Sequence, residues 1–270
     1  MKRTILVTGG TGTVGRPVVE RLTAQGHDVR ALSRRARPGG GVPGTPEPFA
    51  VDLRTGEGLD AAVDGVDAIV HCATTYTGGD ERSAANLFAA ARRAGVPHTV
   101  AISIVGCDRV GIGYYRSRAR IEQALAASGL GHTVLRATQF HDLVRRLCAG
   151  LSRIPVMPVP TMPFQPVDAG EVADRLAELA VGDPVGRAPD LGGPRVEAFR
   201  DLARQYAAWS GRRRLMVPVP LPGRAFTAYR AGGHLAENGD RGTVAFADHL
   251  AARASASTPP SAASGTGQEG

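Results

Sequence analysis

The chain has 270 residues, 43% of them hydrophobic and 21% charged, and no uninterrupted apolar run approaches the roughly 20 residues that cross a membrane. Its formal net charge is +7, but the arginines occur in scattered pairs such as Arg92-Arg93 and Arg145-Arg146 and form no single basic stripe. Three cysteines without C-x-x-C spacing indicate neither a disulfide framework nor a zinc site. We therefore expect a cytoplasmic protein that binds neither nucleic acid, membrane nor metal.

The first residues have the order of a strand, a glycine-rich turn and a helix. Residues 4–8 are a short β-branched run typical of a buried parallel strand, and apolar residues recur at helical spacing from residue 14 until Gly26 ends the helix. In the turn between them, glycine permits the backbone angles, close approach of a pyrophosphate and tight helix packing. The sequence therefore predicts a dinucleotide-binding turn made of Gly9, Thr11, Gly12, Thr13, Val14 and Gly15.

The string TGGTGTVG over residues 8–15 resembles the cofactor loop of the short-chain dehydrogenase/reductase superfamily, in its extended and atypical branches. Its Gly-x-x-Gly-x-x-Gly spacing is one residue wider than the dehydrogenase fingerprint, but the strand before it and the helix after it supply the context that the motif requires. The resemblance implies an NAD(P)H-binding protein.

The second strand, expected over residues 27–33, ends where this fold contacts the adenosine ribose. A carboxylate there binds the 2′-hydroxyl of NAD, whereas an arginine accommodates the 2′-phosphate of NADP. This chain has Ser33 and Arg34 at that point and no acid. The pattern favours NADP(H) over NAD(H); the alternative is that the arginines only occupy a solvated loop.

Strands and helices go on alternating after a surface loop rich in Gly and Pro over residues 37–48. We expect strands over residues 49–51, 66–73 and 98–105, and helices over residues 59–63 and 84–94. This alternation predicts an α/β fold with a doubly wound, Rossmann-type parallel sheet. The resemblance places Asp52 and Leu53 beside the adenine, while the small residues Ala73 and Thr74 suit a nicotinamide ribose that passes close to the backbone.

A second informative stretch begins at Tyr114, which lies one helical turn before Arg118. In the reductases that the chain resembles, a Tyr-x-x-x-Lys pair binds the nicotinamide ribose and makes the phenol a proton donor, and a serine hydrogen-bonds the same carbonyl. The matching residues are Tyr114, Arg118 and Ser103, with arginine in the lysine position, which is not a conservative exchange. Tyr115 is a second candidate; the structural alternative is that both aromatics only pack at a helix start.

The string from Tyr114 through SGLGHTVLRATQF resembles the NmrA-like, NAD(P)H-binding atypical reductases, which include quinone reductases and redox-sensing regulators. A strand is expected over residues 132–136, and open α/β sheets bind ligands at the carboxyl ends of their strands. The residues that follow this strand, Thr138, Gln139 and Phe140, are therefore substrate candidates. His141 and Asp142 are expected to form a surface cap of the next helix, because adjacent helix residues point in different directions; the alternative is an acid/base pair.

The rest of the chain is expected to form a small C-terminal substrate lobe. Five prolines over residues 154–166 demand an extended segment, and Asp168 with Glu171 predicts a capping box before a helix over residues 172–180. Further helices are expected over residues 196–209 and 226–235. We expect a dinucleotide-binding core over residues 1–150, a lobe with the last core strand over 151–254, and a disordered tail over 255–270.

Together these features predict an NADPH-dependent oxidoreductase that reduces a small carbonyl or quinone-like substrate by hydride transfer. A redox-silent NADP(H) sensor that acts through a protein partner is the alternative. Steady oxidation of NADPH with a panel of quinones separates the two. The sequence defines neither the substrate nor the oligomeric state.

Overall fold

The computed structural model describes residues 1–33, 46–75 and 78–257, and its first half alternates strands and helices as the sequence predicts. In chain order this half contains β1 (Thr4–Thr8), α1 (Gly15–Ala24), β2 (Asp28–Ser33), β3 (Glu47–Ala50), α2 (Leu59–Val63), β4 (Ala68–His71), α3 (Asp80–Arg93), β5 (His98–Ile104), α4 (Gly113–Ala127) and β6 (His132–Ala137).

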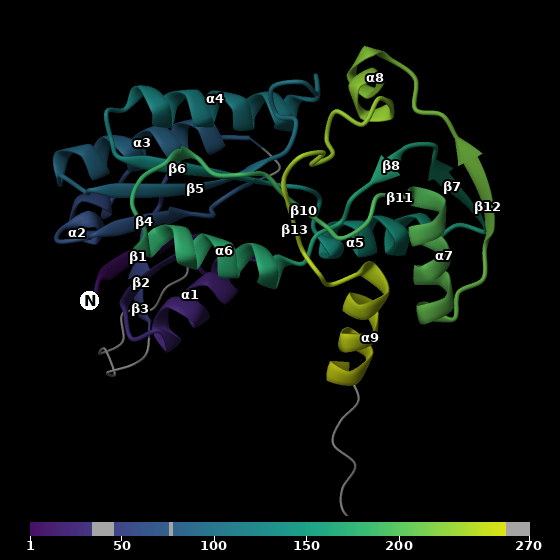
Figure 1. Cartoon of the computed structure of the whole chain (residues 1–270), viewed down its shortest axis with the longest axis horizontal. Helices are drawn as coiled ribbons and strands as arrows, with labels where there is room; N and C mark the ends of the chain where they lie inside the picture. Colours follow the sequence, from purple (N-terminus) through teal and green to yellow (C-terminus); the bar gives the residue numbers. More distant parts are fainter. Residues whose placement is uncertain (34–45, 76–77, 258–270) are drawn as a thin grey trace, which may run out of the picture.

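These strands form one parallel sheet in the order β3-β2-β1-β4-β5-β6, which continues through two short later strands, β10 (Leu191–Gly192) and β13 (Asp240–Arg241). α1 and α6 (Ala169–Val181) lie on one face, and α2, α3 and α4 lie on the other (Figure 1). The order runs outward from β1 in one direction and from β4 in the other. The expected doubly wound Rossmann-type sheet is confirmed, and its switch point lies between the ends of β1 and β4.

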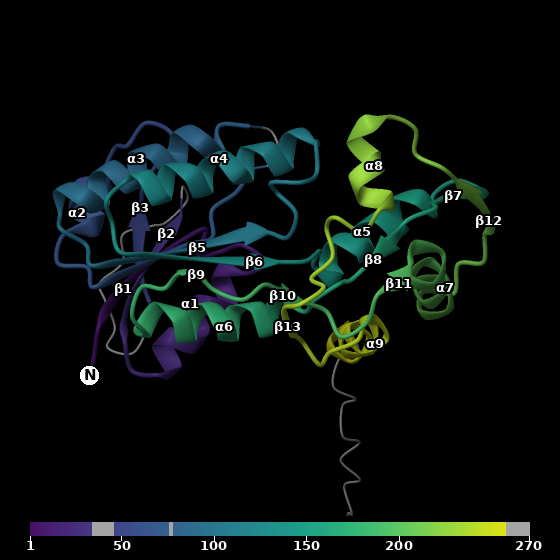
Figure 2. The same cartoon turned by 45° about the horizontal axis from the view of Figure 1, so that its top comes forward.

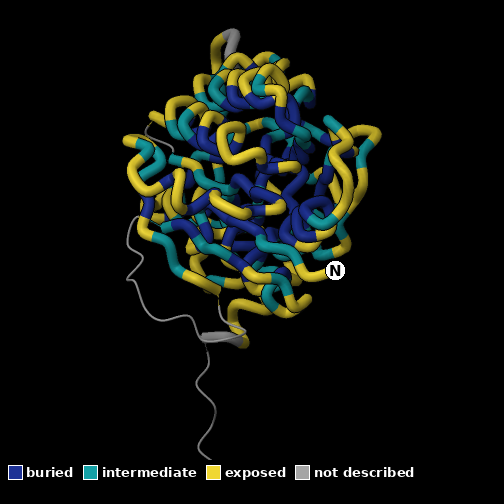
Figure 3. The backbone as a smooth tube through the Cα atoms, turned by 90° about the vertical axis from the view of Figure 1, so that its left-hand side faces the viewer, coloured by how far each residue is buried: buried dark blue, intermediate teal, exposed yellow. Residues whose placement is uncertain are grey.

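Burial on both faces explains why the strands read as continuous apolar runs. In β1, Ile5 and Val7 pack into the cluster under α1 and α6, whereas Leu6 between them packs against α2 and α3 on the other face. All three are fully buried. Figure 3 shows the resulting interior, with buried backbone at the centre and exposed segments around it.

The second half of the chain builds a lobe beyond the carboxyl ends of the sheet (Figures 1 and 2). Its buried apolar cluster includes Phe199 and Phe246. Besides α6, β10 and β13, this half contains α5 (His141–Leu151), β7 (Val156–Pro160), β8 (Pro163–Phe164), β9 (Gly186–Arg187), β11 (Glu197–Ala198), α7 (Phe199–Ser210), β12 (Leu215–Val219), α8 (Arg224–Arg230) and α9 (Phe246–Ser257).

The expected boundary after residue 150 is too simple, because α5 packs in the lobe whereas α6 packs on α1 of the core. The chain therefore crosses between the two parts more than once. The extended proline-rich segment is confirmed: β7 pairs with β12 and β8 pairs with β11. Within the described residues, no helix is long and apolar enough to cross a membrane.

Several element bounds differ from the prediction for identifiable reasons. β3 includes Glu47 and Pro48, which were expected in the loop; β3 is the edge strand, where a residue without an N–H is tolerated. α3 begins at Asp80 rather than at residue 84, and its first turn carries two acids that suit a helix N-terminus. α8 ends at Arg230, before a turn in which Gly232 has φ +78°.

Two further bounds concern α7 and the chain end. α7 begins at Phe199, since Glu197 and Ala198 pair with β8 instead. α9, which the sequence did not predict, runs through Ser257, so the first residues of the expected tail are helical. Residues 258–270 lie outside the described part of the chain.

Candidate functional site

A cavity of about 790 Å³ opens at the carboxyl ends of the strands, at the switch point of the sheet. Each predicted site residue that the structure describes lines this cavity. They are Gly9, Thr11, Gly12, Thr13, Val14, Gly15, Ser33, Asp52, Leu53, Ala73, Thr74, Ser103, Tyr114, Arg118, Thr138, Gln139 and Phe140. Arg34 lies outside the described residues.

The glycine turn has the geometry of an anion cradle. Gly9 has φ +67°, and a Cβ there would lie 2.9 Å from the backbone of Ala73, so only glycine lets the turn pack against the end of β4. The N–H of Gly12 donates to the carbonyl oxygen of Gly9 at 2.8 Å, which closes the turn. Val14, the N-cap of α1, gives no capping side chain, and the first turn of α1 contains no acid. These residues fit the pyrophosphate of NAD(P)H, which the helix N-terminus would hold.

Where Asp52 and Leu53 line the cavity, the loop after β3 is fixed by residues around it. Oδ1 of Asp52 accepts from the backbone N–H of Arg54 at 2.8 Å. Nδ2 of Asn86 on α3 donates to the carbonyl oxygens of Leu53 and Arg54, at 2.9 and 3.1 Å. Part of the Asp52 carboxylate therefore holds its own loop. No local pattern in the sequence indicates this positioning role of Asn86, which lies more than thirty residues from its partners.

Arg118 is buried in the cavity wall and is already paired. Its Nη2 donates to Oδ2 of Asp80 at 2.7 Å and to the hydroxyl of Thr74. Only 3% of the Arg118 side chain and 7% of the Asp80 side chain are exposed. Nε of Arg118 is buried and makes no hydrogen bond within the described residues. The guanidinium is thus neutralised on one side and has a donor left on the other.

The same carboxylate organises the segment after β4. Asp80 accepts from the hydroxyl of Thr74 at 2.8 Å, and from both the N–H and the hydroxyl of Thr75 at 2.7 Å. Asp80 lines the cavity but was not among the predicted site residues. No spacing in the sequence connects it with Arg118, because the two lie on different helices.

Tyr114 and Ser103 both line the cavity but differ in their surroundings. The ring of Tyr114 lies under the Arg118 guanidinium, 5.2 Å from Cζ to the ring centroid. The Ser103 hydroxyl donates to Sγ of Cys107 at 4.0 Å, which in turn donates to Glu122 at 3.2 Å, and Glu122 forms an ion pair with Arg136 at 2.6 Å. Although burial acts in the opposite direction, the hydrogen bonds from Arg136 hold the pKa of Glu122 below its usual value. The serine hydroxyl therefore has a partner beneath the cavity wall.

The three residues after β6 are buried in different surroundings. The hydroxyl of Thr138 donates to the carbonyl oxygen of Gln165 and accepts from the N–H of Gly193 at 3.3 Å, so it ties β6 to neighbouring backbone. Phe140 packs against the apolar cluster beneath the glycine turn. The side chain of Gln139 instead lies against two phenols, Tyr115 and Tyr229. Of the three, only Gln139 has a polar group that faces other polar groups of the cavity wall.

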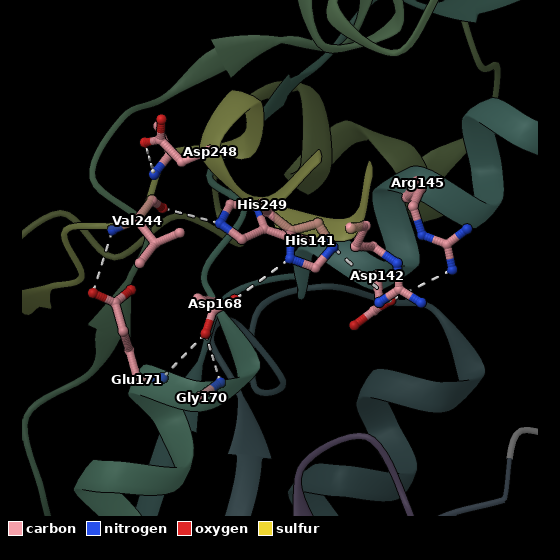
Figure 4. Close-up of polar contacts among 11 residues, drawn as sticks. His141, Asp142, Arg145, Asp168, Gly170, Glu171, Val244, Asp248 and His249 are labelled. Carbon is pink, nitrogen blue, oxygen red and sulfur yellow. Dashed lines mark hydrogen bonds and ion pairs between the residues drawn. The ribbon is translucent and has the colours of Figure 1, made fainter. Parts of the chain in front are cut away.

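The surface cap expected at His141 and Asp142 is wrong, because α9 covers this end of α5 (Figure 4). His141 is 1% exposed, and its Nε2 donates to the carbonyl oxygen of Val244 at 3.0 Å. Its ring also lies 5.1 Å from that of His249 on α9. Burial lowers the pKa of His141, so this ring packs as a neutral group. Asp142 lines the cavity and forms an ion pair with Arg253 at 3.1 Å.

The predicted cap of α6 is confirmed at Asp168, which accepts from the N–H groups of Gly170 and Glu171 at 2.7 and 3.4 Å. His249 lies 3.5 Å from the same carboxylate, and its hydrogen bond holds the pKa of Asp168 below the usual range. The Glu171 side chain accepts from Thr243 and Val244 and so completes no capping box. α9 thus fastens the ends of both α5 and α6.

Comparison with known proteins agrees with this geometry. A family model described as NAD(P)H-binding matches residues 9–146. The (4-alkanoyl-5-oxo-2,5-dihydrofuran-3-yl)methyl phosphate reductase of Streptomyces griseus is 32% identical over 219 residues, which cover 77% of this chain and 74% of that protein. An uncharacterized protein of Mycobacterium tuberculosis is 28% identical over 225 residues, 81% of this chain, but this chain spans only 24% of its length.

Among solved structures, the NADPH-dependent quinone oxidoreductase of Escherichia coli, complexed with NADPH, superposes with a TM-score of 0.74. Its sequence identity is 18%, and the match covers 92% of this chain and 99% of that one. At this identity the likeness concerns the fold.

Proposed function

Since the chain belongs to the NAD(P)H-binding family, we propose that it is an NADPH-dependent oxidoreductase that reduces a small carbonyl or quinone-like substrate. The observation that carries this proposal is that the glycine turn, the Tyr114–Arg118 pair and the residues after β6 all line one cavity. A dinucleotide and a small substrate share such a crevice in open α/β sheets.

In the proposed complex, the glycine turn and the N-terminus of α1 bind the pyrophosphate, and Ser33 and Arg34 bind the 2′-phosphate of the adenosine ribose. Ala73 and Thr74 pass beside the nicotinamide ribose, where Nε of Arg118 donates to a ribose hydroxyl. Asp80 keeps the guanidinium in place. The residues of the lobe close the substrate end and exclude water.

The bound NADPH supplies the hydride. For a saturated carbonyl substrate, Tyr114 donates a hydrogen bond to the oxygen that becomes negative and supplies the proton. For a quinone-like substrate the proton comes from water, and Tyr114 then has only a positioning role. Ser103, whose hydroxyl donates to Cys107, supports the wall next to Tyr114.

Two of the relatives support a reductase of conjugated carbonyls. The Streptomyces protein is named for an unsaturated lactone that carries an alkanoyl group, and the Escherichia coli protein is named for quinones. Both names describe carbonyl oxygens conjugated to carbon–carbon double bonds. The proposed substrate class is the one that these names share.

The proposal is tested by following NADPH oxidation with panels of quinones, unsaturated ketones, aldehydes and saturated ketones. We expect steady turnover with at least one of the conjugated classes. With Tyr114→Phe, turnover of a saturated carbonyl should fall by about 10² while NADPH affinity is nearly unchanged, and turnover of a quinone should fall much less. Turnover with none of the panels, from a protein that binds NADPH, would defeat the reductase proposal and favour the sensor.

The cofactor preference has its own test, because it depends on one side chain. Charge-assisted hydrogen bonds from Arg34 to a 2′-phosphate should contribute about 1.5 to 3 kcal/mol, about ten- to a hundredfold in affinity. Arg34→Asp is therefore expected to shift the preference toward NADH, as measured by fluorescence titration of both nucleotides. Arg200→Asp, at an exposed position of α7 in the lobe and outside the cavity wall, is the matched control. Equal affinities of the unchanged protein for NADH and NADPH would contradict the assignment.

A further inference from the structure

Three polar side chains from separate elements meet in the cavity wall beside Tyr114. They are Tyr115 on α4, Gln139 after β6 and Tyr229 on α8 of the lobe. They are 3%, 2% and 9% exposed, respectively. The two phenol oxygens share a hydrogen bond, and the rings meet edge to face with centroids 5.6 Å apart. Groups that water would otherwise solvate have been buried together where the cavity reaches the lobe.

This cluster has hydrogen-bond donors to spare. Oε1 of Gln139 accepts from the N–H of Gln165 at 3.4 Å, which directs the amide nitrogen away from that backbone. Nε2 is buried and completes no hydrogen bond of good geometry within the described residues, although the amide lies against both phenols. Of the two phenol protons, one lies in the bond between the oxygens and the other is left to donate. Buried donors without partners are unfavourable, so the arrangement calls for an acceptor from a ligand.

The donors are neutral. Burial raises the pKa of Tyr115 and of Tyr229, so both phenols keep their protons at neutral pH. Gln139 carries no charge. Such a set suits a carbonyl oxygen, which offers two lone pairs and no proton.

The lobe fixes the position of Tyr229. Its ring stacks on His234 with centroids 4.0 Å apart, and Nε2 of His234 donates to the carbonyl oxygen of Pro163 at 2.9 Å. Burial lowers the pKa of His234 to about 4, so this support is neutral at physiological pH. The cluster therefore joins the sheet core to the lobe at the substrate end of the cavity.

We propose that Tyr115, Gln139 and Tyr229 form a subsite that binds a substrate carbonyl oxygen, and that they select substrates in which this oxygen is conjugated to the carbon that accepts the hydride. This inference rests on the proposed function. As the new C–H bond forms, the π pair of that carbon moves through the conjugated system and becomes a lone pair on the oxygen. The donors of the subsite stabilise this enolate, which then takes a proton from water. For a quinone, the carbon that accepted the hydride afterwards loses a proton to water while the second oxygen gains one, which gives the hydroquinone.

The test measures binding without turnover. Naphthoquinone and naphthalene share a ring system and differ in their oxygens, so the ratio of their affinities, measured by calorimetry with saturating NADP⁺, reports on the subsite. We expect the unchanged protein to prefer naphthoquinone. Gln139→Leu and Tyr229→Phe should each lower naphthoquinone affinity about tenfold, the effect of one hydrogen bond. Both should leave the affinities for naphthalene and NADPH unchanged.

Two further variants make the result specific. Gln139→Glu keeps the shape but replaces the donor by an acceptor, so naphthoquinone affinity should fall more than in Gln139→Leu. Tyr206→Phe removes a buried phenol of the lobe that does not line the cavity, and should change neither affinity. If Tyr229→Phe fails to fold, the two variants of Gln139 still test whether the subsite binds the carbonyl oxygen.

An equal loss of naphthoquinone and naphthalene binding in Gln139→Leu would reduce its role to packing and overturn the inference. Unchanged naphthoquinone affinity in both glutamine variants would overturn it as well. Failure of the proposed function gives a different result: the unchanged protein would oxidise no NADPH with any substrate, whereas this ratio of affinities would still be measurable and would still depend on Gln139.

Discussion

Asp80→Asn is expected to lower the free energy of unfolding by about 3 to 5 kcal/mol, because it leaves the buried guanidinium of Arg118 without its counter-charge. The ion pair is 2.7 Å long, and both side chains are more than nine-tenths buried. The new amide would also turn a donor toward groups that now donate to the carboxylate, among them the N–H of Thr75. Urea unfolding measures the loss.

Glu81→Gln is the matched control for Asp80→Asn. Glu81 is the next residue of α3 and pairs with Arg120 at 3.2 Å, but these side chains are 44% and 64% exposed. An exposed pair of this kind contributes at most about 1 kcal/mol. Asp80→Asn combined with Arg118→Met should be less destabilised than Asp80→Asn alone, since the uncompensated charge is gone. If Asp80→Asn lowers the free energy of unfolding no more than Glu81→Gln does, Asp80 does not organise the cavity wall.

The Asp80 variant should also weaken NADPH binding. Thr74 and Thr75 owe their positions to this carboxylate, and both line the cavity where the nicotinamide ribose is proposed to lie. The sequence assigns Arg118 and Tyr114 to ribose binding and proton donation. The structure adds Asp80, on another helix, as the residue that supports this pair. In this chain the positive charge of Arg118 is shared with Asp80 before any cofactor arrives.

The parts of the fold that the sequence predicts well depend on neighbouring residues. β1, the glycine turn and α1 are encoded in one continuous stretch, and Gly15 and Val18 already show which side of the helix packs. The parts that it missed depend on distant partners. His141 is buried only because Phe246 and His249 of α9 cover it, more than a hundred residues later. Tyr229 joins Tyr115 in the same way, and no local pattern reports such a contact.

Composition also left α9 unrecognised at the chain end. The tail expected from residue 255 overlaps only the last turn of this helix, which Phe246 and Leu250 anchor in the lobe through their burial. Helical stability here comes from tertiary packing of a few large side chains, which single-residue composition does not register. Within the site, the expected serine and threonine show the same limit. Ser103 and Thr138 line the cavity, but their hydroxyls donate to Cys107 and to the carbonyl oxygen of Gln165.

Gly15→Ala is expected to disable cofactor binding. A Cβ at residue 15 would lie 2.1 Å from the carbonyl oxygen of Gly9 and 2.7 Å from its carbon, closer than any real contact. Both partners are backbone atoms of the turn, and the same Gly9 oxygen already accepts from the N–H of Gly12 at 2.8 Å. The clash can be relieved only by moving the turn away from α1, which disrupts the proposed pyrophosphate cradle.

The clash of the Gly15→Ala methyl group with Gly9 should raise the free energy of the closed turn by about 3 kcal/mol. If NADPH binds only to the closed turn, its affinity should fall about a hundredfold. Gly150→Ala is the control, because Gly150 lies in α5 with nothing within 4 Å of its would-be Cβ. There, alanine should leave NADPH binding unchanged and raise helix stability by about 0.5 to 1 kcal/mol. The two alanines thus have opposite expected effects on thermal stability, and only the first affects NADPH titration. NADPH binding by Gly15→Ala at the affinity of the unchanged protein would show that the phosphates are held elsewhere than at this turn.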